Sequence, residues 1–71
     1  MMEEIARQIL AIVEDLEKET GRKAVEIKVL VERLGREGDL PEETIANAIK
    51  HLQQEGEVFL PKKGFIRRVP H

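Results

Sequence analysis

The sequence predicts a small, mostly helical α+β domain in which three helices are followed by a C-terminal β-hairpin. Apolar residues recur at helical spacing in three successive stretches of the 71 residues. After Gly56 the pattern changes to a strand-like alternation, interrupted once by a Pro- and Gly-containing turn. A chain of this length forms one domain, which we expect to span residues 1–71.

The first helix is expected from Met2 to about Glu19. Its apolar residues recur every three or four positions and are separated by polar ones: Ile5, Ile9, Ile12, Val13 and Leu16. Thr20 and Gly21 end this pattern, because glycine readily takes the left-handed conformation that follows many helices.

The second stretch, Gly21 to Gly38, has two parts. Residues 24–27 alternate as a very short strand would. From Ile27 onwards the apolar residues fall on one helix face: Ile27, Leu30, Val31 and Leu34. Gly35 and Gly38 are expected to mark the end of this second helix.

The third helix has the clearest boundaries. Pro41 is expected in its first turn, followed by Glu42 and Glu43, whose carboxylates favour the positive end of a helix. Its buried stripe is predicted to be Ile45, Ala48, Ile49 and Leu52. Gly56 is expected to terminate it.

A β-hairpin is expected next, with strands at residues 57–60 and 65–69 and a four-residue turn at 61–64. Pro70 then stops the pairing. An isolated two-stranded hairpin is marginal in water, so it must pack on the helices or pair with the short strand near Val25. Three helices closed by such a sheet form a winged helix-turn-helix fold.

Two runs carry a resemblance to a known family: IKHLQQEGEVF at residues 49–59 and PKKGFIRRV at 61–69. They resemble the last helix and wing of the C-terminal winged-helix domain of archaeal minichromosome maintenance (MCM) replicative helicases. Those domains end in a helix, a Leu-x-x-x-Gly step, an apolar strand, a Pro and Gly turn and a basic strand. Many archaeal transcription factors share this pattern.

The residue-level resemblance covers only the last third of the chain. It implies a role in DNA replication or transcription regulation, with protein-contact roles besides DNA contact. The chain opens with Met1 and carries no ATPase domain. We therefore expect either a domain excised from a larger protein or a stand-alone small protein.

The charges are unevenly distributed along the chain. All 14 acidic residues lie between Glu3 and Glu57 among eight lysines and arginines, which gives that part a charge of −6. Residues 58–71 carry four lysines and arginines and no acid, giving +4. The fraction of charged residues, 37%, together with the lack of cysteine, is typical of heat-adapted proteins and favours a thermophilic source.

The third helix could enter a DNA groove. With its apolar stripe turned inward, its outer face carries Asn47, Lys50 and Gln54, next to Glu43. Asn and Gln can pair with adenine in the major groove, and Lys can reach guanine or phosphate. The helix has no arginine, and an ordinary solvated face remains an alternative.

The hairpin supplies the remaining candidate residues. Lys62 and Lys63 lie at its tip, and Arg67 and Arg68 point to opposite faces of the returning strand. Such a cluster without acidic neighbours is expected to bind phosphate. Lysines also protect sheet edges from aggregation, and the two roles are compatible.

Several other side chains have both a purely structural and a functional interpretation. Phe59 and Phe65 could stack on unpaired bases, but we expect at least one of them to cover the core. His51 could contact phosphate or sense pH, although a half-exposed helix histidine is the simpler interpretation. The acids at the end of the first helix are expected to form a solvated face or to meet a basic partner: Glu14, Asp15, Glu17 and Glu19.

Several function classes find no support. The chain has no serine or cysteine nucleophile and no Gly-rich phosphate loop, so we expect no enzymatic activity, cofactor or small-molecule substrate. His51 and His71 alone cannot form a closed zinc site, and we expect no metal. No apolar run is long enough to cross a membrane, and the lack of cysteine suits a reducing cytoplasm.

The sequence thus predicts a nucleic-acid-binding domain, with duplex DNA preferred over single strands. The third helix would lie near the groove and the basic wing on the phosphates. The alternative is a protein-interaction module without DNA contact, using the first helix to meet a partner protein or a second copy.

Overall fold

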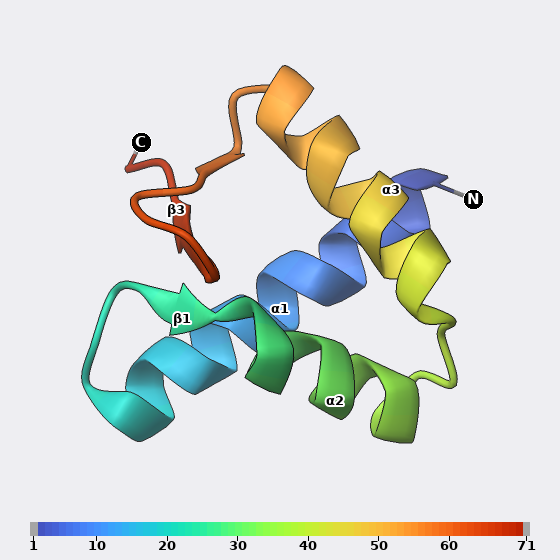
Figure 1. Cartoon of the computed structure of the whole chain (residues 1–71), viewed down its shortest axis with the longest axis horizontal. Helices are drawn as coiled ribbons and strands as arrows, with labels where there is room; N and C mark the ends of the chain where they lie inside the picture. Colours follow the sequence, from blue (N-terminus) through green and yellow to red (C-terminus); the bar gives the residue numbers. More distant parts are fainter. Residues whose placement is uncertain (1, 71) are drawn as a thin grey trace.

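The three predicted helices and the short strand are present in the predicted order (Figure 1). The computed structural model describes residues 2–70; Met1 and His71, the ends of the predicted domain, lie outside the described residues. The helices are α1 (Met2–Thr20), α2 (Ile27–Glu37) and α3 (Glu42–Gln54), and the strands are β1 (Val25–Glu26), β2 (Val58–Phe59) and β3 (Phe65–Arg68). The predicted winged helix-turn-helix fold is therefore confirmed.

Glycines end α1 and α3 as the sequence predicts. Gly21 has φ 70°, and its N–H donates to the carbonyl of Glu17 at 2.8 Å. Gly56 has φ 73°, and beyond it the N–H of Glu57 donates to the carbonyl of Leu52 at 2.9 Å. Both arrangements satisfy carbonyls that the end of a helix would otherwise leave without a partner.

The boundaries around α2 and α3 differ from the prediction. Gly35 does not end α2 but lies within it, since an exposed helical glycine costs only about 1 kcal/mol relative to alanine. Gly38 is the C-cap with φ −104°, and Asp39 rather than a glycine takes the left-handed conformation, with φ 52°. Pro41 precedes the first turn of α3 as its N-cap, and its carbonyl accepts the N–H of Ile45.

The sheet has the order β1-β3-β2, with both pairs antiparallel. The hairpin pairs with the short strand near Val25, one of the two predicted arrangements, through Ile66 and Val25, and Arg67 pairs with Phe59. The predicted hairpin is too long, because only Val58–Phe59 pairs with the second half of β3. The first half of β3 pairs with β1 along its other edge, and the connection between β2 and β3 contains a turn in which the N–H of Phe65 donates to the carbonyl of Lys62 at 3.1 Å.

The core lies where α1 packs against α2, α3 and the inner face of the sheet. Its buried residues include the whole predicted stripe of α3 and one residue from each strand: Ala6, Ile9, Val13, Leu16, Val25, Leu30, Leu34, Ile45, Ala48, Ile49, Leu52, Val58 and Ile66. Ile5, Ile12, Ile27 and Val31, predicted on buried faces, are only partly buried. Among residues 2–70 no helix is long and apolar enough to span a lipid bilayer.

Candidate nucleic-acid interface

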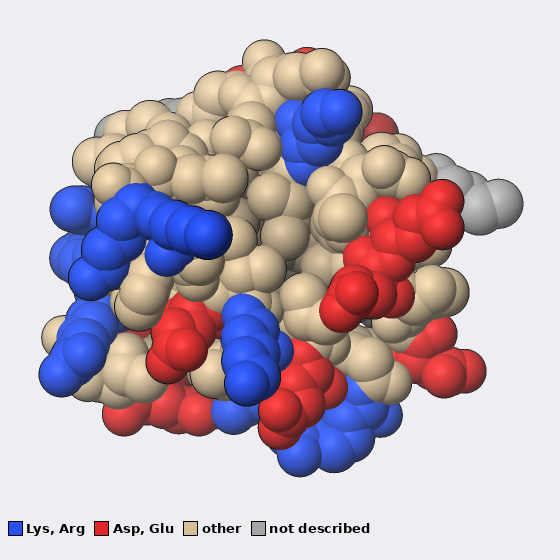
Figure 2. Space-filling view, in the orientation of Figure 1, with Lys and Arg blue, Asp and Glu red and all other residues tan. Residues whose placement is uncertain are grey.

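The outer face of α3 carries the predicted polar residues. Asn47, Lys50 and Gln54 are all exposed, because the buried stripe turns the opposite side of α3 toward α1. Lys50 makes no ion pair with any residue between 2 and 70. Glu42 and Glu43 lie in the first turn. Figure 2 shows acidic atoms where Figure 1 places the beginning of α3, so the start of this helix repels an anion.

The loop between β2 and β3 holds the two exposed lysines of the wing. Lys62 and Lys63 have no ion-pair partner within the described part of the chain. The Lys62 ammonium lies 4.4 Å from the centre of the Phe65 ring, within the range of a cation–π contact. This contact leaves the charge of Lys62 uncompensated by any carboxylate.

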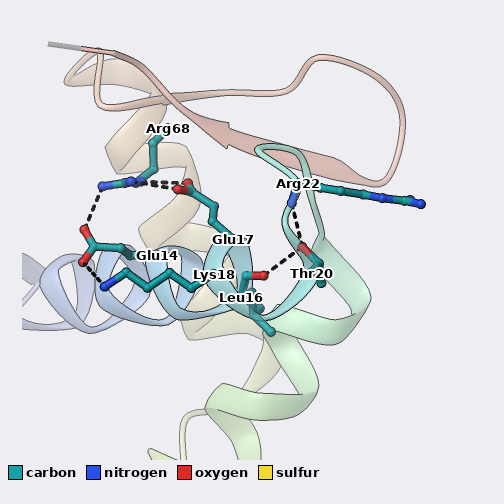
Figure 3. Close-up of polar contacts among 7 residues, drawn as sticks. All are labelled: Glu14, Leu16, Glu17, Lys18, Thr20, Arg22 and Arg68. Atoms are coloured by element: carbon teal, nitrogen blue, oxygen red, sulfur yellow. Dashed lines mark hydrogen bonds and ion pairs between the residues drawn. The ribbon is translucent and has the colours of Figure 1, made fainter.

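Unlike Lys62 and Lys63, Arg68 has acidic partners, because two acids of α1 bind its guanidinium (Figure 3). Its Nε and Nη2 donate to the two carboxylate oxygens of Glu17, each at 2.8 Å, and its Nη1 donates to Glu14 at 3.0 Å. The hydrogen bonds from Arg68 lower the pKa of Glu17, and the same bonds raise the pKa of Arg68. The prediction that the wing cations lack acidic neighbours is therefore wrong for Arg68, whose charge is compensated by two carboxylates and which uses three of its five N–H donors on them.

The acids of α1 were expected to form a solvated face, and Glu14, Asp15 and Glu19 are indeed exposed, whereas the side chain of Glu17 is only 12% exposed. Glu14 and Glu17 bind Arg68, while Glu19 accepts two hydrogen bonds from Arg33 of α2, at 2.8 and 2.9 Å. These ion pairs fasten α1 to β3 and to α2. Their partners are 14 to 54 residues apart in the sequence, so no local pattern indicates them.

Arg67 points away from Arg68, as predicted from strand alternation. Its guanidinium carbon lies 5.9 Å from the centre of the Phe59 ring. Its Nε is buried and has no hydrogen-bond partner among the described residues. A shallow hollow beside β3 is lined by Glu17, Lys23, Arg67, Arg68, Val69 and Pro70. Three cations and one acid line this hollow. Accordingly, the charges of Lys23 and Arg67 add to Arg68 in lowering the pKa of Glu17.

Neither phenylalanine belongs to the core. Phe59 is 39% exposed, and Phe65 is half-buried but lies outside the buried cluster and outside the apolar residues packed against it. The expectation that one of them covers the core is not supported. Register explains this, because Phe59 pairs with Arg67 and Phe65 lies two residues before Arg67, which puts both rings on the outer face of the sheet.

A groove between α2, α3 and the wing adds a cation that the sequence reasoning missed. Figure 2 shows it as a hollow near the middle of the face. Its lining is Glu26, Ile27, Lys28, Val31, Glu32, Glu42, Ala46, Ile49, Lys63, Gly64 and Phe65. The N–H of Ile27 donates to the carbonyl of Gly64 at 2.9 Å, which places the first turn of α2 beside the wing loop.

Lys28 lies in that first turn, where α2 has no acidic residue, in contrast to α1 and α3. A lysine in the first turn is unfavourable beside the positive end of the helix dipole. This unusual position is the signal in the sequence that could have identified Lys28 as a candidate site residue. Lys28 and Lys63 thus line the groove together with three acids, Glu26, Glu32 and Glu42.

The described residues contain no group of three or more His, Cys, Asp or Glu side chains placed to hold a metal ion. His51 is half-buried on α3 beside Leu52 and lines a separate hollow against α1. No protein-family model matches the chain, and no curated protein matches it in sequence. The resemblance to archaeal MCM helicases therefore stays a prediction.

Proposed function

We propose that this domain binds nucleic acid, with duplex DNA as its principal ligand, in replication or transcription regulation in the cytoplasm. The observation that carries the proposal is the state of the wing cations. Lys62 and Lys63 are exposed and lack an acidic partner in residues 2–70, whereas the charge of Arg68 is compensated by α1. Uncompensated lysines on a protruding loop are suited to backbone phosphates.

The contact surface continues from the wing onto the helices. Lys28 lies beside the wing loop, and Lys50 lies on the exposed face of α3. Asn47 and Gln54 supply amides that can pair with adenine in the major groove. Glu42 and Glu43 repel phosphates at the start of α3, so we expect modest affinity and weak sequence preference.

Salt dependence is the quantitative form of this proposal. Three to four phosphates neutralised by lysines and Arg67 give a log–log salt slope of about −3 to −4 on duplex DNA. Arg68 is not counted, because moving its guanidinium to a phosphate would leave Glu17 without its hydrogen bonds. The replacement Lys62→Gln should reduce the magnitude of the slope by about 0.9.

The test is a titration with a short generic duplex at low salt, followed through backbone amide shifts. Shifts at residues 62–64 together with Asn47, Lys50 and Gln54 support the proposal. Lys62→Glu combined with Lys63→Glu should weaken binding to all sequences alike. No shifts at millimolar DNA, or unchanged affinity of the double variant, would contradict it.

A matched control is available on α2. Arg36 is exposed, and within the described chain it has no ion-pair partner, as is true of Lys63. Arg36→Glu and Lys63→Glu change the net charge equally. If only the total charge mattered, both would weaken binding equally, whereas a wing interface requires a larger loss for Lys63→Glu.

The groove between α2, α3 and the wing favours a second candidate function, a protein-interaction module. Ile27, Val31, Ala46 and Ile49 give it an apolar floor. By contrast, Met2 is the only exposed large apolar side chain on the described part of α1, which gives the predicted α1 contact little apolar area. Concentration-dependent dimerisation in sedimentation experiments, abolished by Ala46→Glu, would support this second candidate.

A further inference from the structure

The outer face of the sheet has a composition that duplex binding does not explain. It presents Phe59 from β2, Phe65 and Arg67 from β3, and Lys62 reaching over from the loop; we refer to these four residues as the wing platform. Phe59 and Phe65 are diagonal neighbours across the strand pair, so their side chains start about 7–8 Å apart. The two rings are the only aromatic side chains in the sequence.

The rings of the wing platform differ in burial, since Phe59 is exposed and Phe65 is half-buried. Both lie outside the core, and Leu60, next to Phe59, is also exposed, at 44%. Isolated exposed apolar residues are ordinary, but here two neighbours, Phe59 and Leu60, are exposed, and Phe65 of the same hairpin is half-buried. Each ring instead has a cation near its face, Lys62 at 4.4 Å and Arg67 at 5.9 Å.

The charges around the platform indicate an anionic ligand. Neither Lys62 nor Arg67 has a carboxylate partner in the described chain, and the hollow that Arg67 lines also holds Lys23 and Arg68, with Glu17 as its one acid. Glu26, which pairs with Phe65, is the one acid among the strand residues. The platform therefore alternates cations with aromatic rings and carries a positive excess.

We propose that the wing platform binds single-stranded nucleic acid, with unpaired bases stacking on Phe59 and Phe65 and phosphates bound by Lys62, Arg67 and Lys23. The proposal rests on the nucleic-acid-binding function above and extends it to a second ligand form. Bases inside a duplex have their faces covered by their neighbours, so only unpaired bases can use the rings. Stacking on exposed aromatic rings tolerates any base.

The observations favour this ligand over other anionic partners. The carboxylates of an acidic peptide would use the cations but would not stack on the rings. An anionic lipid surface would contact Leu60 as strongly as Phe59, because all that it requires is exposed apolar area near positive charge. The pairing of each ring with a cation matches a nucleotide, which joins a planar base to a phosphate.

The test compares a short single-stranded oligothymidylate with a duplex, using fluorescence anisotropy and the ring-proton shifts of the full chain. Phe59→Leu and Phe65→Leu retain apolar bulk but remove the ring. Each should weaken binding of the single strand by about fivefold or more, with duplex affinity unchanged. Phe59→Tyr and Phe65→Tyr should restore it. Leu60→Ala is the matched control and should leave both affinities unchanged.

The outcomes separate this proposal from the function on which it rests. Upfield ring-proton shifts with the single strand, lost in the leucine variants, support stacking. Unchanged single-strand affinity in Phe59→Leu combined with Phe65→Leu overturns the platform, as does an equal loss in Leu60→Ala. Binding of the duplex alone overturns only the platform, whereas no binding of either form overturns the proposed function as well. Circular dichroism of each variant confirms that it is folded.

Discussion

Replacing Arg68 by methionine tests whether this residue belongs to the scaffold rather than to the interface. Methionine keeps much of the apolar stem and removes the guanidinium, so Glu17 loses two hydrogen bonds of 2.8 Å. The side chain of Glu17 is only 12% exposed, and water cannot fully replace those donors. Glu14 is more exposed and can rehydrate.

The magnitude follows from burial. Hydrogen bonds to charged groups contribute about 1.5–3 kcal/mol each, whereas exposed ion pairs contribute about 0–1 kcal/mol. Arg68 is 37% exposed, so the buried value must be discounted, and we expect a loss of about 2 kcal/mol in the free energy of unfolding. For a domain of this size that lowers the melting temperature by roughly 10 °C.

The assay is urea and thermal denaturation followed by far-ultraviolet circular dichroism, with Arg33→Met as control. Arg33 donates a similar pair of hydrogen bonds to Glu19, but that carboxylate is 53% exposed and can rehydrate. The control should therefore lose less stability. Equal losses in the two variants, or no loss in Arg68→Met, would refute the reasoning. The salt slope of duplex binding should be unchanged in Arg68→Met, since Arg68 contacts no phosphate in the proposed complex.

Three further predictions concern stability. Arg68 lowers the pKa of Glu17 from its ordinary value of 4.5, so the ionised Glu17 contributes fully to the free energy of unfolding at neutral pH, and this contribution is lost as pH falls below about 4.5. When the free energy of unfolding is measured against pH, Arg68→Met should therefore lose less stability in acid than the native chain does. Gly56→Ala should cost about 1 kcal/mol in urea denaturation, from left-handed strain alone, because nothing lies within 4 Å of an added Cβ. Ile66→Val, fully buried in the central strand, should cost about 1 kcal/mol by the same measurement, and a neutral result would contradict the packing described for β3.

The helices could be predicted from the sequence because their determinants are local. The buried stripe of α3, from Ile45 to Leu52, follows from a spacing of three and four residues, and Gly56 ends the helix through its own backbone freedom. Pairing of the hairpin with the strand at Val25 was also predictable, since a lone hairpin is unstable. How far β2 and β3 pair could not be predicted, because the alternation of apolar residues indicates a strand but does not fix where its ladder ends.

The candidate site was less predictable than the fold, since it depends on contacts between distant residues. In the sequence Arg67 and Arg68 are equivalent neighbours. Only the packing of α1 against β3 brings Glu14 and Glu17, which are 54 and 51 residues away in the sequence, to Arg68. The same limit applies to Lys28, whose place beside the wing depends on the hydrogen bond between the first turn of α2 and the loop.

Arg67 and Arg68 point to opposite faces of β3, and this difference also affects the orientation of the wing. The wing loop has a turn hydrogen bond from Phe65 to Lys62, but the strands that carry it are short, so contacts with the helices are also needed to fix its orientation. Arg68 does this from the inner face, where its bonds to α1 hold β3 without using the outer face. Arg67 and Lys62 thereby remain on the outer side with the phenylalanine rings. A surface held in place in the free protein loses less entropy on binding, so small exposed clusters of this kind can contribute measurable affinity.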